Sequence, residues 1–578
     1  MSIQTVTSEA QGLLDIATLS RLAGEFFAEL PGGGSNPALA PAIEAAPAGQ
    51  GHAAQAPRQG GAAQGVPQAY AAALPLPSAS APTRPAPGGY YFIDEAKAPQ
   101  QATAAPDPVI EDRVTPQAFG LPGQDSLKAL LTDFRELNGA RDASGGYYFV
   151  QPEQQRAYEA RAGEPQTKPR SVPGGFDVDA VRRDFPILQE RVNGRQLVWL
   201  DNAATTQKPQ QVIDRLAHFY QHENSNIHRA AHELAARATD AYEGARDTVA
   251  RFLGAASSEE IIFVRGATEG INLVAKSWGA KHIGAGDEII VSHLEHHANI
   301  VPWQQLAAEK GARLRVIPVD DTGQVLLDEY RKLLNPRTKL VAVTQVSNAL
   351  GTIVPVHEIV ALAKAVGART LVDGAQSVSH LRVNVQALGA DFFVFSGHKV
   401  FAPTGIGVVY GRRDVLEETP PWQGGGNMIA DVTFERTVYQ PPPARFEAGT
   451  GNIADAVGLG AALDYLQKLG LENVAKYEHD LLEYATHQLA PIPGLRLIGT
   501  ALQKTSVLSF VLQGYQTEQI GKALNDEGIA VRSGHHCAQP ILRRFGLEAT
   551  VRPSLAFYNT CDEIDHLAAV VKRLAHRR

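Results

Sequence analysis

A lysine and an aspartate each follow an apolar run of the kind that forms a buried strand. Lys399 comes after FFVFSGH, and Asp373 ends TLVD, with Gln376 three residues further on. A surface loop is the ordinary interpretation of a lysine, but an amine at the end of a buried strand is unusual because desolvation disfavours its charge. In α/β sheets the carboxyl ends of the strands form the ligand crevice. An amine and a buried carboxylate at that place favour pyridoxal phosphate, which forms a Schiff base with lysine and whose ring nitrogen needs an anionic partner.

A phosphate group needs a cradle of its own, and one segment of the chain offers it. The segment FVRGATEGINLVA (263–275) combines an apolar strand, a glycine turn and the start of a helix, with Thr268 near the helix start. Backbone N–H groups and the positive end of the helix dipole suit a phosphate at such a place. The glycine pattern by itself is weak evidence for a phosphate site. The presence of Lys399 and Asp373 later in the same chain makes that evidence stronger.

Alternating strand and helix signals run from about residue 176 onward. Short apolar runs predict buried strands, and amphipathic stretches between several of them predict helices. The strand candidates are EIIFV, EIIVS, LRVIPV, KLVAVTQV, TLVDGA, FFVFS and GIGVVYG, and the helix candidates include INLVAKSW, VPWQQLAAEKG and HEIVALAKAVG. This order predicts an α/β fold with a largely parallel sheet covered by helices on both faces. We expect a large domain over 176–451, whose N-terminal segment contributes to a smaller α+β domain over 452–578.

Ten motifs in this part of the chain occur in the order found in one family. They are DNAATTQKP, NIHRAAHELA, FVRGATEGINLVA, EHHANIVPW, QVSNALGT, LVDGAQSV, FSGHKVFAPTGIG, RFEAGTGN, RSGHHCAQP and RPSLAFYNT. From about residue 176 to its end the chain therefore resembles the SufS-type (group II) cysteine desulfurases of the class V aminotransferase family. The resemblance implies a fold-type I pyridoxal phosphate-dependent transferase that forms a homodimer with active sites at the subunit interface. It also implies conversion of L-cysteine to L-alanine, with the sulfur passing as a persulfide to a SufE-like or SufU-like acceptor for iron–sulfur cluster assembly or storage.

The same resemblance assigns cofactor-binding roles by position. Lys399 corresponds to the Schiff-base lysine, Asp373 to the partner of the ring nitrogen and Gln376 to the hydrogen-bond partner of the ring hydroxyl. His296, in EHHANI, corresponds to the residue that stacks on the ring and shuttles protons. The phosphate ligands correspond to Thr268, Ser396 and His398, and to Gly424 and Thr450 contributed by a neighbouring subunit.

The resemblance also places substrate-binding residues and a nucleophile. Arg552 corresponds to the clamp on the substrate carboxylate, a role that suits a bidentate guanidinium; Asn348 is expected to assist it, and Arg532 lies beside the nucleophile. The nucleophile is Cys537 in RSGHHCAQP. A lone cysteine is more often a core residue, but polar and cationic neighbours such as these can favour the thiolate. Cys561, expected near the start of the terminal helix, is interpreted as a core residue.

Other activities stay open at this stage. Selenocysteine lyase and cysteine sulfinate desulfinase share the cofactor and the alanine product, and no residue separates them from a desulfurase. A catalytically idle scaffold is disfavoured because Lys399, Asp373, Arg552 and Cys537 are all present.

Histidine pairs in EHHANI and SGHHC invite a zinc hypothesis. Neither HExxH nor CxxC accompanies them, and the cofactor interpretation uses the same residues, so we expect no metal. His228 and His232 lie four residues apart, and we expect them on one helix as interface or solvated residues.

Composition excludes several other classes of protein. The chain has 578 residues with 53 basic and 61 acidic side chains, a formal net charge of −8, so it lacks the basic excess of a nucleic-acid-binding protein. Two cysteines rule out a disulfide framework and favour a reducing compartment. The first residues show no secretory signal, and no apolar run is long enough for a transmembrane helix. We therefore expect a cytoplasmic enzyme that binds neither nucleic acid nor membrane.

Residues 1–175 differ in composition from the rest of the chain. The stretch 31–110 holds 14 of the 36 prolines, and such a sequence cannot bury enough apolar surface to offset the entropy of ordering it. We expect a largely disordered extension with short docking motifs, namely an amphipathic helix in 13–30 and the repeat GGYYF at 88–92 and 145–149. The pattern resembles the cargo-loading extensions of cysteine desulfurases packaged inside encapsulin shells, and a tether to an assembly scaffold is the alternative.

Overall fold

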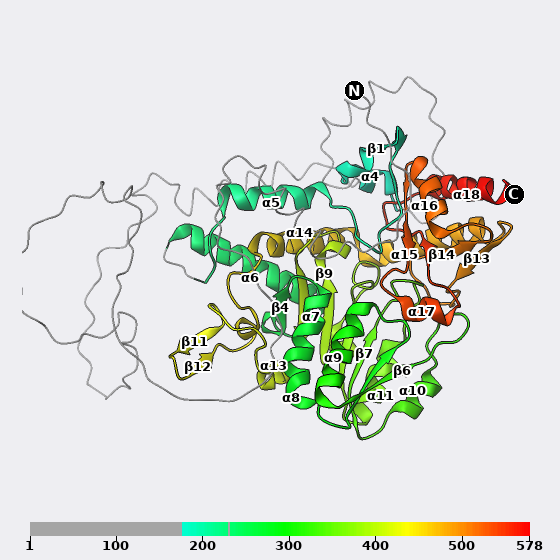
Figure 1. The fold of residues 1–578 in the computed structure, drawn as a ribbon. Coiled ribbons are helices and arrows are strands. Elements are labelled where there is room, and N and C mark those ends of the chain that lie inside the picture. Colours follow the sequence, from blue (N-terminus) through cyan, green and yellow to red (C-terminus); the bar gives the residue numbers. More distant parts are fainter. Residues whose placement is uncertain (1–175, 229–231, 578) are drawn as a thin grey trace, which may run out of the picture. The chain divides into compact units, whose positions relative to one another are not determined.

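The computed structural model describes residues 176–228 and 232–577, and Figure 1 shows its ribbon. The N-terminal extension, with its expected helix and its two GGYYF copies, lies outside the described residues. None of the helices in the described ranges is long and apolar enough to cross a membrane.

A seven-stranded sheet forms the centre of the described chain. In spatial order its strands are β4 (Ile261–Val264), β10 (Gly407–Gly411), β9 (Phe392–Ser396), β8 (Arg369–Asp373), β7 (Thr338–Thr344), β5 (Glu288–Ser292) and β6 (Arg313–Ile317). Strands β6, β5, β7, β8 and β9 run parallel, and β10 is antiparallel to both β9 and β4. The predicted α/β fold with a largely parallel sheet is confirmed, and all seven strand candidates lie in this sheet.

Alternate side chains along each strand enter two separate apolar clusters, one on each face of the sheet. In β9, Phe393 and Phe395 belong to one cluster, and Phe392 and Val394 belong to the other. The first face is covered by α6 (Glu233–Leu253), α11 (Val356–Ala365) and α14 (Ile453–Leu469), and the second by α7 (Ala267–Val274), α9 (Val301–Lys310) and α13 (Arg413–Glu418). Because both faces are covered, β4, β5, β9 and β10 are buried along their whole length, whereas the edge strand β6 is only partly buried.

A second sheet lies in the C-terminal part of the chain. Its four strands are antiparallel and follow the spatial order β13 (Leu495–Ile498), β14 (Ser509–Leu512), β17 (Thr550–Arg552) and β16 (Arg532–Gly534). The helices packed around it are α15 (Leu471–Leu489), α16 (Thr517–Asp526) and α18 (Cys561–His576). Strand β3 (Val198–Trp199) pairs in parallel with β15 (Ile529–Ala530), which joins the beginning of the described chain to this part. The division into domains 176–451 and 452–578 stays a prediction.

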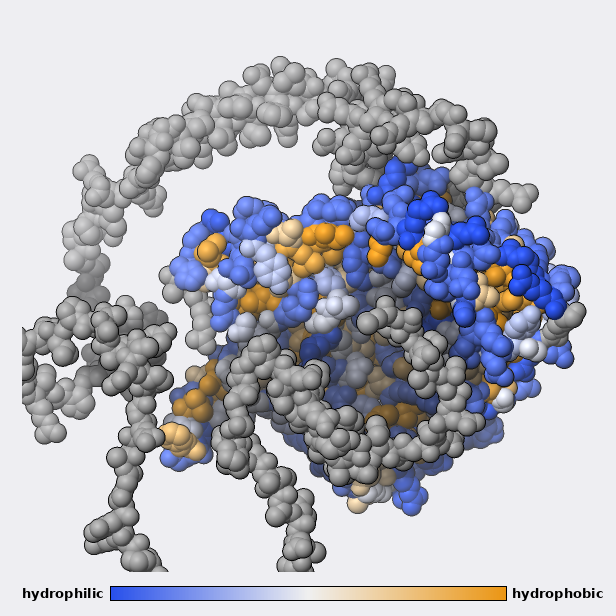
Figure 2. Space-filling view, turned by 45° about the horizontal axis from the view of Figure 1, so that its top comes forward, coloured by the Kyte–Doolittle hydropathy of each residue, from blue (hydrophilic) through white to orange (hydrophobic). Residues whose placement is uncertain are grey.

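The remaining α-helices and strands lie outside the two sheets and the helices named above. They are α4 (Val178–Arg183), β1 (Arg191–Val192), β2 (Arg195–Gln196), α5 (Gln210–His222), α8 (Ala280–His282), α10 (Leu327–Leu333), α12 (Val385–Leu388), α17 (Gln539–Arg544) and the hairpin of β11 (Ile429–Val432) and β12 (Thr437–Tyr439). The hairpin projects from the described chain, and Phe434 between its strands is fully exposed. Figure 2 shows apolar residues gathered on this projection.

His228 and His232 do not share a helix, so that expectation is wrong. His228 has a left-handed backbone with φ of +56°. Helix α6 begins only after His232, whose Nδ1 accepts the Ala235 N–H at 3.2 Å. A side chain at this position satisfies one of the free N–H groups of a helix start. The four-residue spacing therefore crosses a helix boundary.

Candidate active site

A cavity of about 470 Å³ opens at the carboxyl ends of β7, β8 and β9. Residues of β16, of β17 and of the loop before α17 complete its wall, so both sheets contribute. The predicted site residues that line it are Lys399, Asp373, Gln376, His296, Thr268, Ser396, His398, Asn348, Arg532, Cys537 and Arg552. The fold thus brings together in one cavity residues that lie far apart in the sequence.

The turn after β9 presents Lys399 to this cavity. Gly397 lets the chain turn tightly, because a Cβ there would lie 2.7 Å from Ile406 Cγ2. Within the described residues the Lys399 amine has no hydrogen-bond or ion-pair partner. Burial lowers the pKa of the Lys399 amine to about 8, although the Asp373 carboxylate opposes that shift. An amine with this pKa is neutral in an appreciable fraction near pH 8, as addition to a carbonyl carbon requires.

Asp373, the last residue of β8, faces the cavity from the neighbouring strand. Its Oδ1 accepts the Ala375 N–H at 2.9 Å. Burial raises the pKa of the Asp373 carboxyl, while the Ala375 N–H and the Lys399 amine act in the opposite direction. Gln376 donates from Nε2 to the carbonyl of Ala203 at 2.6 Å. A buried carboxylate needs a cationic partner, so Asp373 suits a protonated ring nitrogen.

His296 enters the cavity as a neutral ring with a defined tautomer. Its Nδ1 accepts the Ala298 N–H at 3.0 Å, so the ring proton lies on Nε2. Burial lowers the pKa of His296 to about 3, and the Lys399 amine adds to that shift. The ring therefore acts as a hydrogen-bond donor through Nε2.

The N-terminus of α7 lies at the edge of the cavity. The Ala267 N–H donates to Ser396 Oγ at 2.9 Å, which ties the helix start to the end of β9. The N–H and hydroxyl groups of Thr268 have no acceptor within the described part of the chain. Burial and the Lys399 amine lower the pKa of His398 to about 4, so this ring is neutral. Free donors at a helix N-terminus suit an anionic phosphate.

The buried guanidinium of Arg552 lines another part of the wall. Its Nη1 donates to the carbonyl of Asn348 at 2.9 Å, and its Nη2 lies 3.4 Å from Asp201 Oδ1. Its Nε is buried without a partner among the described residues. Burial lowers the pKa of Arg552 to about 10, although the negative charge of Asp201 opposes this shift. Asp201 also forms an ion pair with Arg532 at 3.0 Å. A guanidinium with a free donor suits the carboxylate of a substrate.

Cys537 lies on a loop whose backbone adopts an uncommon conformation. His536 and Cys537 both have φ of +53°, a region that non-glycine residues occupy only when their surroundings hold them there. The carbonyls of these two residues accept hydrogen bonds from Asn348 Nδ2 at 2.7 Å and from the His297 N–H at 2.8 Å. Cys537 is exposed, whereas Cys561 is buried at the start of α18, as expected. The loop therefore offers the Cys537 thiol at the cavity.

Comparison with known proteins identifies the family. The family model described as Aminotransferase class-V matches residues 198–567. The chain belongs to this family. A cysteine desulfurase from Synechococcus elongatus is 68% identical over 446 residues, which cover 75% of this chain and 71% of that protein. A cysteine desulfurase from Klebsiella pneumoniae is 52% identical over 400 residues, which cover 69% of this chain and 98% of that protein. The crystal structure of a cysteine desulfurase from Escherichia coli matches with a TM-score of 0.65 at 38% identity, covering 69% of this chain and 98% of that one.

Pyridoxal phosphate, the cofactor that membership of the class V aminotransferases implies, fits the donor set of the cavity. Two of the cavity groups without a protein partner are the Lys399 amine and the Thr268 donors, which the aldehyde and the phosphate of this cofactor would satisfy. The residues that would hold it are Lys399, Asp373, Gln376 and His296 around the ring and Thr268, Ser396 and His398 around the phosphate. Nowhere in 176–228 and 232–577 do three His, Cys, Asp or Glu side chains gather as a metal site requires.

Gly424 and Thr450 do not line the Lys399 cavity. Thr450 lines a second cavity of about 440 Å³ together with Arg265 and Glu447, and Gly424 is exposed. Their expected role is toward the phosphate of a neighbouring subunit, and it stays a prediction.

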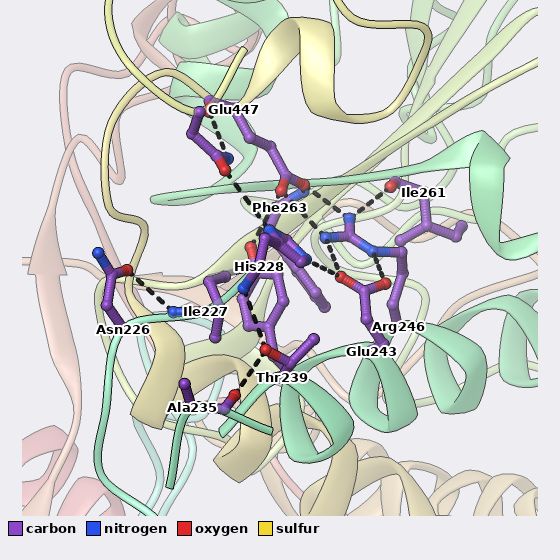
Figure 3. A network of polar contacts seen from close by, with 12 residues as sticks. Asn226, Ile227, His228, Ala235, Thr239, Glu243, Arg246, Ile261, Phe263 and Glu447 are labelled. Atoms are coloured by element: carbon purple, nitrogen blue, oxygen red, sulfur yellow. Dashed lines mark hydrogen bonds and ion pairs between the residues drawn. The ribbon is translucent and has the colours of Figure 1, made fainter. Parts of the chain in front are cut away.

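Figure 3 shows a network that anchors the segment before Thr450. The buried Arg246 donates to Glu447 Oε1 at 2.6 Å and to Oε2 at 3.0 Å. Burial alone would lower the pKa of Arg246, but Glu447, Tyr242 and Glu243 together outweigh burial and raise the pKa. The Glu243 carboxylate contacts both Arg246 and His228. Its Oε2 accepts the Arg246 Nε–H at 2.9 Å, and its Oε1 lies 2.8 Å from His228 Nε2. The network ties the segments of His228 and Thr450 to α6.

Three supporting residues received no role in this site from the sequence, and His297 was weighed only as part of the histidine pair of EHHANI. Asp201 pairs with two arginines of the cavity, and its place directly after the apolar run VWL was the available signal. His297 holds the Cys537 loop, and its signal was the second histidine of EHHANI. Arg246 lies in the middle of a helix, where the sequence gives no sign that an arginine is buried.

Proposed function

We propose that this chain is a pyridoxal phosphate-dependent cysteine desulfurase. L-Cysteine and the Cys537 thiol give L-alanine and a Cys537 persulfide: the C–S bond of the substrate breaks, an S–S bond forms, and a proton replaces the sulfur on carbon. The observation that carries the proposal is the meeting of Lys399, Arg552 and the exposed Cys537 thiol around one cavity. Similarity to proteins named cysteine desulfurase, at up to 68% identity, supports it.

Each cavity residue has a task that its environment allows. Arg552 binds the substrate carboxylate through its free Nε. When bound, pyridoxal phosphate supplies an electron sink for negative charge that develops on the substrate. The Lys399 amine, with its pKa near 8, takes up or returns a proton at Nζ. His296 holds a proton at Nε2, and the Cys537 thiolate attacks the substrate sulfur.

Product analysis tests this activity against its two alternatives. The purified enzyme is given L-cysteine, L-selenocysteine and cysteine sulfinate separately, and alanine is measured. We expect alanine from L-cysteine together with a persulfide on Cys537 detected by mass spectrometry. Alanine from selenocysteine alone would indicate a selenocysteine lyase, and alanine from the sulfinate alone would indicate a desulfinase.

Arg552→Lys is expected to raise the KM for L-cysteine about tenfold, with a smaller change in kcat. Lysine keeps the charge beside Asp201 but lacks the planar fork, and a hydrogen bond to a charged group is worth about 1.5–3 kcal/mol. Steady-state alanine formation gives both constants. Arg543→Lys, on the exposed side of α17, is the control and should leave both unchanged. A wild-type KM in Arg552→Lys would contradict the carboxylate role.

We infer that the enzyme is a SufS-type (group II) homodimer that passes its sulfur to a SufE-like or SufU-like acceptor. The position of Gly424 and Thr450 outside the Lys399 cavity supports a role in a second subunit. The projecting hairpin with its exposed Phe434 offers apolar surface for such contacts. Light scattering on the purified chain tests the dimer, and a monomer with full activity would contradict it.

We propose that residues 1–175 form a docking extension that loads the enzyme into an encapsulin shell. The two GGYYF copies support this, because aromatic side chains are strong anchors and tethered copies gain affinity through effective concentration. The match to the Synechococcus protein covers 75% of this chain, more than 176–578 can account for, so the similarity reaches into the extension. A tether to an iron–sulfur assembly scaffold is the alternative.

Removing the extension is expected to separate docking from catalysis. A chain that begins at Ser171 keeps every proposed site residue, so its kcat/KM should stay within about twofold of the full chain, a difference of about 0.4 kcal/mol. Co-expression with a candidate shell protein should give co-sedimentation of the full chain and none of the shortened one.

Changing the aromatic residues of both GGYYF copies to alanine in the full chain is the finer variant. It should weaken co-sedimentation with the shell protein without affecting turnover. Changing one copy should weaken co-sedimentation less than changing both copies. An insoluble or inactive shortened chain would show that the extension is needed by the folded enzyme.

A further inference from the structure

The carbonyl oxygen of His398, the residue before Lys399, is surrounded by donors. The Thr205 hydroxyl lies at 3.0 Å, the Thr206 N–H at 3.0 Å, the Thr206 hydroxyl at 3.1 Å and the Lys208 amine at 3.3 Å. A carbonyl oxygen has two lone pairs, so these four donors exceed what it can accept at full strength. Loss of a donor that serves only this carbonyl therefore changes little.

Thr206 differs from the other donors because it has a second partner on the same turn. Its Oγ also accepts the N–H of Phe401 at 2.8 Å. Phe401 is fully buried and has a left-handed φ of +66°, which is unfavourable for a bulky residue unless neighbours hold it. A buried N–H without an acceptor is also unfavourable. One hydroxyl thus bridges His398 and Phe401 on either side of Lys399.

The segment that carries Thr206 is itself fixed from behind. Asn202 donates to the carbonyl of Ser554 at 2.7 Å, and the Ala203 N–H donates to Ser554 Oγ at 2.9 Å. Ser554 follows Arg552 by two residues. The segment 201–208 therefore links the chain just after β17 to the turn 397–401. Hydrogen bonds to Ser554 hold it on one side, and the Thr206 hydroxyl contacts the turn on the other.

We propose that Thr206 is a positioning residue that sets where the Lys399 amine lies in the cavity. The proposal rests on the proposed function, which gives Lys399 its role toward the cofactor. Thr206 acts through the backbone: without its hydroxyl the Phe401 N–H loses its acceptor, the turn relaxes, and Nζ moves relative to Asp373. Small displacements of a reacting group lower the reaction rate strongly. Removal of the Thr206 hydroxyl therefore slows proton transfer at Nζ. It does not weaken binding of the substrate carboxylate, because Arg552 binds that group.

The test compares Thr206→Val with Thr205→Val in the full-length holoenzyme. Both changes replace a hydroxyl by a methyl group, but only the first removes the acceptor of the Phe401 N–H. We expect Thr206→Val to lower kcat for alanine formation about tenfold with the KM for L-cysteine within about twofold. It should also shift the midpoint of the pH-dependent absorbance change of the bound cofactor.

The other variants should behave differently. Thr205→Val should match the wild type in kcat, KM and midpoint, and Thr206→Ser, which keeps the hydroxyl, should recover both kcat and midpoint. Wild-type kcat and midpoint in Thr206→Val, equal losses in Thr205→Val, or no recovery in Thr206→Ser would each overturn the proposal.

A measurement that does not need turnover separates this proposal from the proposed function. Uptake of pyridoxal phosphate by the apoprotein, followed by absorbance, should be slower in Thr206→Val and unchanged in Thr205→Val. If the wild type makes no alanine from L-cysteine, the proposed function fails while this comparison still decides the role of Thr206. Where circular dichroism shows that Thr206→Val is not folded, Thr206→Ala takes its place with the same expectations, and wild-type uptake in that variant overturns the proposal.

Discussion

Replacing Lys399 by alanine is expected to abolish alanine formation from L-cysteine. The amine is the group that would hold the cofactor, and burial brings its pKa to about 8, where it can move protons near neutral pH. General acid–base catalysis alone raises a reaction rate by roughly 10²–10⁴-fold. The variant loses this contribution and also the covalent attachment of the cofactor. The dialysed protein should therefore lose its visible cofactor absorbance, which is measured beside the product assay.

The control for this variant is Lys332→Ala on the exposed side of α10, which should keep both absorbance and turnover. A wild-type circular dichroism spectrum of Lys399→Ala would show that the losses come from the missing amine and not from unfolding. Normal alanine formation by Lys399→Ala would refute the assignment of this lysine.

Most of the central sheet could be predicted from the sequence because strands such as β4, β5, β9 and β10 are buried along their whole length. Runs such as EIIVS and FFVFS coincide with β5 and β9, and every residue in them is buried. The direction of β10 could not be found in this way, since GIGVVYG resembles the parallel strands although it runs antiparallel to β9. Its signal lies in the connection 397–406, which is shorter than the crossover of a dozen or more residues that parallel strands need.

The site could be predicted where motif residues themselves carry the chemistry, and not where they support it. Lys399 and Asp373 were recognisable because a charge at the end of a buried strand is unusual. Thr206 is a plain threonine until the fold brings the Phe401 N–H to it. Arg246 likewise belongs to an ordinary helical pattern, and its burial depends on a glutamate from a distant segment. The residues around Thr206 and Arg246 in the sequence do not reveal that their partners are Phe401 and Glu447.

Replacing Cys537 by serine is expected to separate sulfur transfer from cofactor binding. The variant should bind pyridoxal phosphate and show an absorbance change with L-cysteine, because neither step uses the thiol. Alanine formation from L-cysteine should fall by roughly 10²-fold or more, since a hydroxyl cannot replace the thiolate as a nucleophile toward sulfur. Mass spectrometry should find no persulfide. Selenocysteine, whose C–Se bond is weaker, is expected still to react.

Cys561→Ser is the matched control for this nucleophile, because the two cysteines are the only ones in the chain. Cys561 is buried at the start of α18, whereas Cys537 is exposed on a loop whose left-handed backbone is held at both carbonyls. The Cys561→Ser enzyme should therefore retain the persulfide on Cys537 and the wild-type rate of alanine formation. A persulfide on Cys561 in the Cys537→Ser enzyme, with alanine still produced, would show that the nucleophile was wrongly chosen. Loss of the cofactor absorbance change in Cys537→Ser would instead place the thiol in substrate binding and contradict its role as a nucleophile alone.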